Sequence, residues 1–279
     1  MYIYLMVKLK SRRAWAVGVI LALAGVTACA GGETAGAPKQ GEVAEIWRPA
    51  EEGAADMPEF SAATAPLPSC FRGARGAAAY RLPGASGDGR LVTLGSGPRG
   101  VAFAPISWGD ACEWAAEAKR LAAAGYRVTT FDWGSDRRRT VTEATRLLRS
   151  RGAERVAWVG GCMGGTLMLG MLTDRTDGED GSVRPVGVAG ISPLASLGGY
   201  TAGEGTSYDG ELLLLGTVDD PLADEDSLRQ VAKGFLEAEV KVLPGTLHAA
   251  EIFAGPHGDT ARRTLDGFLD RTFARHQSS

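Results

Sequence analysis

The strongest chemical signal in the sequence is a cysteine set between two pairs of glycines. Residues 160–165 read Gly-Gly-Cys-Met-Gly-Gly, and they join a strand predicted over 155–159 to an apolar helix predicted over 166–172. A thiol on a sharp strand-to-helix turn is exposed as a nucleophile, and the helix N-terminus offers N–H groups to a developing anion. Glycines suit this turn because side chains beside the nucleophile would collide with neighbouring backbone. The alternative is a glycine-rich turn that carries a buried structural Cys162.

Two further segments could supply the base and the acid that such a nucleophile needs. The strand predicted over 211–215 leads to Asp219 and Asp220, and the strand predicted over 239–243 is followed by His248. Nucleophile, acid and base therefore each follow a predicted strand. In an open parallel sheet such residues meet at the carboxyl edge, where ligands bind. Taken alone, the histidine is more often a surface residue and either aspartate a turn residue.

The elements that must position these residues alternate between strands and helices. Short apolar runs predict strands at 101–104, 127–131, 155–159, 185–191, 211–215 and 239–243. Apolar residues recur at helical spacing around 114–122, 141–148, 228–235 and 265–269. This alternation predicts a parallel sheet covered by helices on both faces, preceded by an antiparallel hairpin over 78–82 and 90–94.

The cysteine elbow, the order Cys, Asp, His and the strand–helix pattern resemble the α/β-hydrolase superfamily over residues 78–273. The cysteine nucleophile makes the dienelactone-hydrolase-like branch the most similar one. The resemblance implies an α/β-hydrolase fold, with a mostly parallel sheet of about eight strands and no lid domain, since the 191–211 connection is short. The sequence departs from the family where Pro105-Ile106 replaces the usual His-Gly of the oxyanion loop, and where Ala249 follows the base.

The resemblance implies that the protein hydrolyses a small carboxylic ester, lactone or thioester through a Cys162–His248–Asp219 triad and an acyl-enzyme. No metal or other cofactor is expected. Family acids usually lie three residues after the glycine that ends the strand, which favours Asp219. Asp220 precedes a proline, as turn residues often do.

Backbone N–H groups complete the implied site. Those of Met163 and Ser107, or failing Ser107 that of Ile106, are expected to bind the oxyanion. The altered oxyanion loop keeps a second function open, in which the chain is a catalytically degenerate envelope lipoprotein that binds a ligand or partner. Acyl transfer to an alcohol uses the same acyl-enzyme and is a third possibility.

The first 28 residues predict export. Four basic residues and no acid precede an apolar run over 14–28, as in a signal peptide, and the run ends in Val-Thr-Ala before Cys29. This ending resembles a bacterial lipobox, which predicts a lipid on Cys29 that anchors the protein in the cell envelope. An ordinary cleavage site without lipid is the alternative. Residues 29–68 are rich in Ala, Gly, Pro and Glu and predict a flexible tether before a domain over 69–279.

The number of cysteines and histidines and the overall charge exclude some classes of protein, and two of the cysteines predict a disulfide. Four cysteines and three histidines are too few and too scattered for a zinc-finger framework, and a net charge of −3 gives no reason to expect nucleic acid as a partner. With Cys29 and Cys162 assigned, Cys70 and Cys112 remain in an exported chain, where disulfides persist. We predict that they pair, against the alternative of two separate buried thiols.

Overall fold

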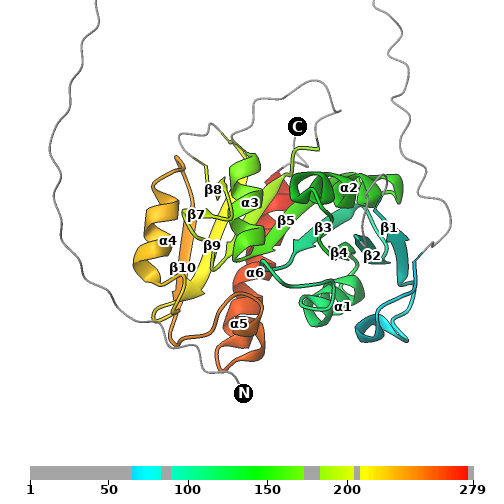
Figure 1. The fold of residues 1–279 in the computed structure, drawn as a ribbon, viewed down its shortest axis with the longest axis horizontal. Helices are drawn as coiled ribbons and strands as arrows, with labels where there is room; N and C mark the ends of the chain where they lie inside the picture. Colours follow the sequence, from blue (N-terminus) through cyan, green and yellow to red (C-terminus); the bar gives the residue numbers. More distant parts are fainter. Residues whose placement is uncertain (1–64, 83–88, 173–182, 204–207, 276–279) are drawn as a thin grey trace, which may run out of the picture. The chain divides into compact units, whose positions relative to one another are not determined.

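A computed structural model describes residues 65–82, 89–172, 183–203 and 208–275 (Figure 1). The predicted signal peptide, the candidate lipidation residue Cys29 and the tether up to residue 64 lie outside the described residues. All described residues belong to one compact unit, Ala54–Ser279. In these parts of the chain no helix has both the length and the apolar character needed to cross a membrane.

The centre of the fold is a sheet of eight strands in which only β2 runs against the others. In spatial order the strands are β1 (Ala78–Arg81), β2 (Arg90–Gly95), β4 (Arg127–Phe131), β3 (Arg99–Ala104), β5 (Arg155–Gly161), β6 (Gly187–Ile191), β9 (Glu211–Thr217) and β10 (Glu239–Leu243). β2 is antiparallel to both β1 and β4, and the other pairs are parallel. The predicted hairpin and the predicted parallel sheet are both confirmed.

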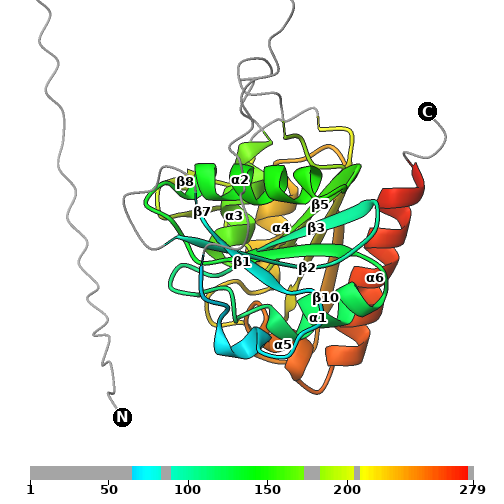
Figure 2. The same ribbon diagram turned by 90° about the vertical axis from the view of Figure 1, so that its right-hand side faces the viewer.

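The central strands are apolar throughout because helices cover both faces of the sheet. Val101 and Phe103 of β3 face one core cluster, with the apolar side chains of α1 (Ala115–Ala123) and α6 (Gly258–Arg275). Ala102 and Ala104 face the other, with those of α2 (Arg137–Ser150), α3 (Met163–Met171) and α4 (Glu225–Ala232). Figure 2 shows α2 and α3 on one side of the sheet and α1 on the other. Burial on both faces explains why these strands show no alternation of polar residues.

The connection from β6 to β9 contains, in its described part, only the two-residue strands β7 (Ser196–Leu197) and β8 (Tyr200–Thr201), which pair with each other. The short helix α5 (Glu251–Ala254) lies between β10 and α6. The carboxyl ends of the central strands are therefore bordered by short segments, in agreement with the predicted absence of a lid domain.

The domain begins earlier than the predicted start at Ser69. Ala65 N donates a hydrogen bond to Ala79 O of β1, at 3.2 Å. Leu67 is half-buried against the core cluster that contains Phe71. The composition of residues 65–68 shows no period and predicts a tether, but backbone pairing and the packing of Ala65 and Leu67 on the core fix this segment on the domain.

The predicted disulfide is confirmed. Cys70, in the 3₁₀ turn η1 (Ser69–Phe71), is bonded to Cys112, which lies just before α1, and their Cα atoms are 5.7 Å apart. The bond closes a loop with a sequence separation of 42 residues. It fastens the start of the domain to the segment that runs from β3 into α1.

Removing this disulfide tests how much it contributes to the stability of the domain. We expect the double variant Cys70→Ser, Cys112→Ser to lose about 3–4 kcal/mol of unfolding free energy, because its unfolded chain is no longer constrained by a closed loop. Urea denaturation followed by tryptophan fluorescence measures the loss. Reductant should destabilise the native protein and leave the double variant unchanged. Equal midpoints for the two oxidised proteins would contradict the expectation.

Candidate active site

The turn at Cys162 has the geometry that the sequence predicts for a nucleophile. β5 ends at Gly161, α3 begins at Met163, and Cys162 between them has φ 47° and ψ −114°. Its N–H donates to Ile191 O at 2.8 Å and its carbonyl accepts from Thr166 N at 2.9 Å. The strained backbone is thus held from both sides, by β6 and by the first turn of α3.

The flanking glycines are required by contact between backbones. A Cβ atom on Gly160 would lie 2.5 Å from the backbone of both Gly164 and Gly165. A Cβ atom on Gly164 would lie 2.6 Å from Pro105 O. No side chain fits at these positions, so α3 starts directly against the ends of β5 and β3 and carries Cys162 to the edge of the sheet.

The acid that meets His248 is Asp220, and the prediction of Asp219 is wrong. Asp220 Oδ2 lies 2.7 Å from His248 Nδ1, and the Asp220 side chain is fully buried, whereas Asp219 is exposed. The backbone explains the shift by one residue. Val218 N and Asp219 N donate to Leu243 O and Gly245 O, so β9 continues its pairing and points the Asp219 side chain outward before the chain turns.

The turn itself then orients Asp220. Its Oδ1 accepts hydrogen bonds from Leu222 N at 2.9 Å and from Ala223 N at 3.1 Å, which leaves Oδ2 for the histidine. Because Pro221 follows it, Asp220 is expected to be a turn residue. It is one, and the same hydrogen bonds fix its carboxylate against the imidazole.

The surroundings favour an ionised pair. Burial alone would lower the pKa of His248, but the Asp220 carboxylate and, after it, the Cys162 side chain outweigh burial and raise the pKa to about 10. Burial would raise the pKa of Asp220, whereas His248 and the N–H groups of Leu222 and Ala223 lower it. His248 is therefore an imidazolium at neutral pH. Its Nε2 is buried and makes no hydrogen bond of normal geometry within the described residues, although Cys162 is near enough to affect the ring's charge.

Ser192 is a positioning residue that sequence reasoning missed. It is fully buried, directly follows β6 and has φ 51°. Its Oγ accepts a hydrogen bond from Ala249 N at 3.1 Å, and its hydroxyl also lowers the pKa of Asp220 through a hydrogen bond. Ala249 has φ 49°. Ser192 thus connects the acid to the backbone next to the base, and a serine before Pro193 at a strand end is the only sign of this in the sequence.

The predicted oxyanion donors lie on two adjoining segments. Met163 is the first residue of α3, where N–H groups have no partner within the helix. Ser107 is half-buried in the turn after β3, where Gly109 N donates to Ile106 O. The alternative donor, Ile106 N, already binds the carboxylate of Glu113, at 3.0 Å and 3.3 Å from its two oxygens.

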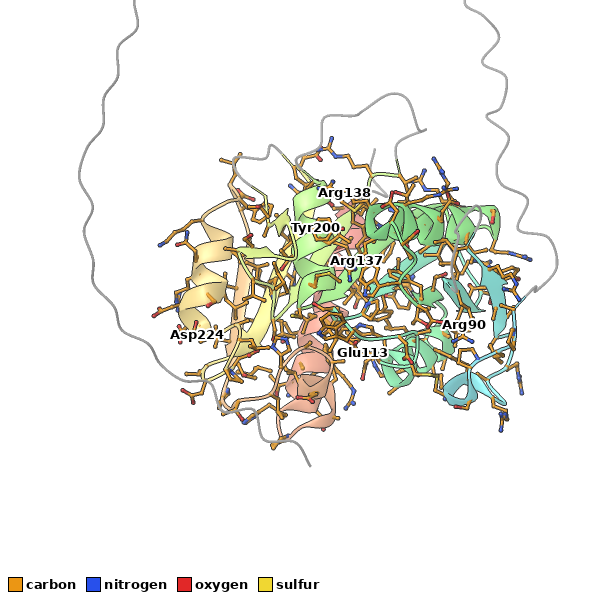
Figure 3. All side chains as sticks on the ribbon, in the orientation of Figure 1. Arg90, Glu113, Arg137, Arg138, Tyr200 and Asp224 are labelled. Carbon is orange, nitrogen blue, oxygen red and sulfur yellow. A yellow bond between two sulfur atoms is a disulfide. The ribbon has the colours of Figure 1, made fainter. Side chains whose placement is uncertain are left out.

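Glu113 brings a fourth ionisable group to the site, beside Cys162, His248 and Asp220 (Figure 3). A Cβ atom on Gly161 would lie 3.1 Å from Glu113 Oε1 and 3.2 Å from the side chain of Ala249. Burial raises the pKa of Glu113 to about 7, against the lowering effect of the Ile106 N–H. A glutamate just before a helix is an ordinary feature of sequences, so nothing marked this residue in advance.

Trp133 fixes the loop that carries Ile106. Its Nε1 donates to Ile106 O at 2.8 Å, and its ring packs against Phe131, with centroids 5.1 Å apart. The guanidinium of Arg137 lies 5.9 Å from the centre of the Trp133 ring, and that of Arg138 lies 5.7 Å from the ring of Tyr200 (Figure 3). The loop after β3 is therefore held in place by an aromatic side chain.

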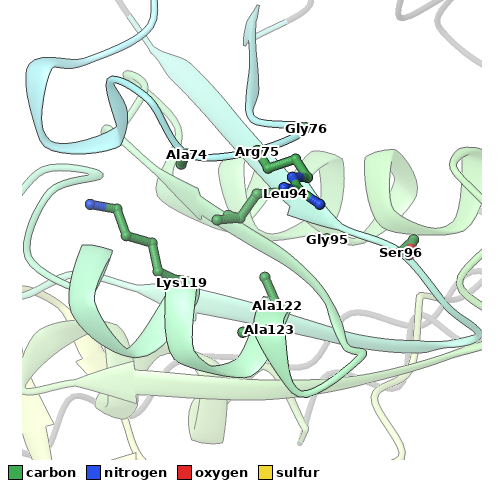
Figure 4. A pocket seen from close by; sticks show the side chains of 9 residues that line it. All are labelled: Ala74, Arg75, Gly76, Leu94, Gly95, Ser96, Lys119, Ala122 and Ala123. Carbon is green, nitrogen blue, oxygen red and sulfur yellow. The ribbon is translucent and has the colours of Figure 1, made fainter.

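A cavity of about 590 Å³ lies away from these residues (Figure 4). Its lining includes Arg75 before β1, Ser96 after β2 and Lys119 of α1, and none of the residues discussed above. In the described part of the chain no cluster of His, Cys, Asp and Glu is arranged to hold a metal ion.

The acid assignment can be tested through the histidine. In Asp220→Asn the amide oxygen still accepts the turn's N–H groups, but the negative charge that opposes the effect of burial most strongly is gone. We expect the pKa of His248 to fall well below about 10, measured by NMR titration of the imidazole. Asp219→Asn, the matched control, should leave the pKa unchanged. If the pKa of His248 fell only in Asp219→Asn, the acid would be Asp219 and not Asp220.

The sequence matches no protein-family model and no curated protein. Solved structures resemble it. A lid-less α/β serine hydrolase from Xanthomonas campestris (15% identity) covers 72% of this chain and 95% of its own, with a TM-score of 0.52. A putative aryl esterase from Burkholderia cenocepacia (13% identity) covers 71% of this chain and 99% of its own, with a TM-score of 0.54. The propionate-bound esterase Est2 of Thermogutta terrifontis (15% identity) covers 74% of this chain and 94% of its own, with a TM-score of 0.51. Together with the strand order and the elbow after β5, these similarities show that the described domain has the α/β-hydrolase fold.

Proposed function

We propose that the protein hydrolyses a small carboxylic ester, lactone or thioester, with Cys162 as nucleophile, His248 as base and Asp220 as acid. The observation that carries this proposal is the buried Asp220–His248 pair, whose free Nε2 borders a cysteine on a strained elbow. A buried ion pair of this kind contributes little to stability by itself. It suits a site in which a neighbouring thiol must lose a proton and a leaving group must gain one.

In the proposed resting state the Cys162 proton already lies on His248 Nε2, so the reaction begins from a thiolate beside an imidazolium. Asp220 favours the imidazolium, and the imidazolium favours the thiolate beside it. The thiolate attacks the carbonyl carbon, and the oxyanion is stabilised by backbone N–H groups at the start of α3 and in the loop after β3. The tetrahedral intermediate collapses as Nε2 gives its proton to the leaving alcohol, so that a thioester remains on the enzyme.

Water completes the proposed cycle. His248, now neutral, accepts a proton from a water molecule that attacks the thioester carbonyl, and the carboxylic acid leaves as Cys162 regains its proton. An alcohol in place of this water would give acyl transfer by the same steps. Because a thiolate is itself a good leaving group, activated esters, lactones and thioesters suit this nucleophile better than peptides do.

The comparisons add support of a general kind. Two of the similar structures are named esterases, one of them putatively an aryl esterase, and a third is named a serine hydrolase without a lid. At 13–15% identity these names describe the neighbours. They support ester hydrolysis here only together with the geometry of the triad. The dienelactone-hydrolase-like subtype rests on the cysteine alone.

Replacing the nucleophile tests the proposal. We expect Cys162→Ala to lower kcat/KM for a short activated ester by at least about 10³-fold, since removing a triad nucleophile removes the acyl-enzyme. Cys162→Ser should also lose most activity, because an alkoxide needs a stronger base and better oxyanion support than a thiolate. Alkylation of the native protein should block turnover, since Cys162 is the only free cysteine among the described residues. An unchanged rate in Cys162→Ala would instead favour a binding lipoprotein.

We also propose that the mature protein is exported and anchored in the cell envelope by a lipid on Cys29. The support is the lipobox-like sequence after a basic and apolar segment, together with the Cys70–Cys112 disulfide, since disulfides persist outside the cytoplasm. We expect mass spectrometry of the mature N-terminus to find a diacylglycerol on Cys29, and Cys29→Ala to release the protein from membranes. An unmodified N-terminus at Gly31 would contradict the anchor.

A further inference from the structure

The carboxylate of Glu113 binds a backbone N–H at the place where a reacting oxygen needs one. Ile106 N donates to both carboxylate oxygens, and the Ile106 residue directly follows the Pro105 that packs on α3. A Cβ atom on Gly164, in the first turn of α3, would lie 2.6 Å from Pro105 O. A Cβ atom on Gly161, the residue before Cys162, would lie 3.1 Å from Glu113 Oε1, so the carboxylate that binds Ile106 N lies next to the elbow.

Ile106 N is the alternative to Ser107 N as the second oxyanion donor. The N–H of Met163 at the helix start and an N–H from the loop after β3 must together face the oxygen of the tetrahedral intermediate. In the structure the loop donor is occupied by a side chain of the protein itself. A substrate carbonyl that is to use Ile106 N must displace the Glu113 carboxyl group.

The charges around Glu113 act on it in both directions. Asp110, in the same loop, and Glu251, in α5, disfavour its ionised form, and His248 favours it. Burial, the largest of these influences, sets the pKa of Glu113 at about 7. Glu113 therefore changes its charge within the pH range in which an esterase of this kind is assayed.

We propose that Glu113 gates the oxyanion site: ionised, it holds the Ile106 N–H and closes the site, and protonated, it releases this N–H to the substrate carbonyl. This inference rests on the proposed function and adds a pH control to it. The ionised group closes the site for two reasons. A carboxylate accepts a stronger hydrogen bond than a neutral carboxyl group does, and a carboxylate and an oxyanion sharing one N–H repel each other.

The obvious alternative is that Glu113 only stabilises the loop 105–113. The Ile106 contact, and the near approach to Gly161, serve that role equally well. A structural role and a gate differ in one measurable respect. A structural carboxylate affects stability and scales the rate by a constant factor, whereas a gate changes how the rate depends on pH.

The test compares native protein, Glu113→Gln and the control Glu143→Gln, which removes a buried carboxylate paired with Arg146 on α2. The ratio of kcat/KM of Glu113→Gln to that of the native protein isolates the effect of Glu113, because both proteins keep the same nucleophile and base. We expect this ratio to rise about tenfold between pH 6 and pH 8, because the native protein loses the protonated form of a group with a pKa of about 7. Glu143→Gln should follow the native profile.

A second measurement is made on the native protein alone and requires no activity assay. The amide of Ile106 in ¹⁵N-labelled native protein should shift with a midpoint near pH 7, as the carboxyl group bound to it loses its proton. A ratio that stays constant from pH 6 to pH 8 in an active enzyme, or an Ile106 amide that does not titrate, overturns the gate. Neither result affects the proposed function, which fails only if Cys162→Ala retains activity.

Discussion

The site depends on one close contact between backbones, that of Gly160 at the end of β5 with Gly164 and Gly165 at the start of α3. Because no side chain separates strand from helix, the chain must turn within one residue, and Cys162 takes the positive φ that this turn imposes. Hydrogen bonds to β6 and within α3 offset the strain. The same contact brings the helix N-terminus, with its unpaired N–H groups, next to the sulfur.

The parallel sheet supplies the rest of the geometry. β6, β9 and β10 end side by side, so the residues that follow them converge although they are far apart in sequence. Ser192 follows β6, Asp220 follows β9 and His248 follows β10, and hydrogen bonds join the serine to the acid and the acid to the base. Each residue alone is an ordinary turn residue. Their function comes from the strand order, in which β9 lies between β6 and β10.

Much of this could be predicted from the sequence, and the failures have a common physical origin. Strands, helices and the elbow follow from local patterns of sequence, and the disulfide follows from the two cysteines that remain once Cys29 and Cys162 are assigned. The choice of Asp220 over Asp219 was missed because it depends on how far β9 continues to pair with the segment after β10. Glu113 was missed because its partner, Ile106 N, becomes its neighbour only when the loop closes on itself. The residue spacing that is usual in the α/β-hydrolase family carries no information on either contact.

His248 and Glu113, the two half-buried ionisable groups discussed beside Cys162, both have a raised pKa, but for opposite reasons, and this fits a thiol nucleophile. His248 has its pKa raised because Asp220 compensates its charge, whereas Glu113 has its pKa raised because burial leaves its charge poorly compensated. Near neutral pH the site then holds one firm positive charge and one carboxyl group close to its midpoint. A serine nucleophile needs a neutral imidazole as base, which such a site disfavours. A thiolate needs a stable imidazolium beside it and a proton ready for the leaving group, and the Asp220–His248 pair provides both.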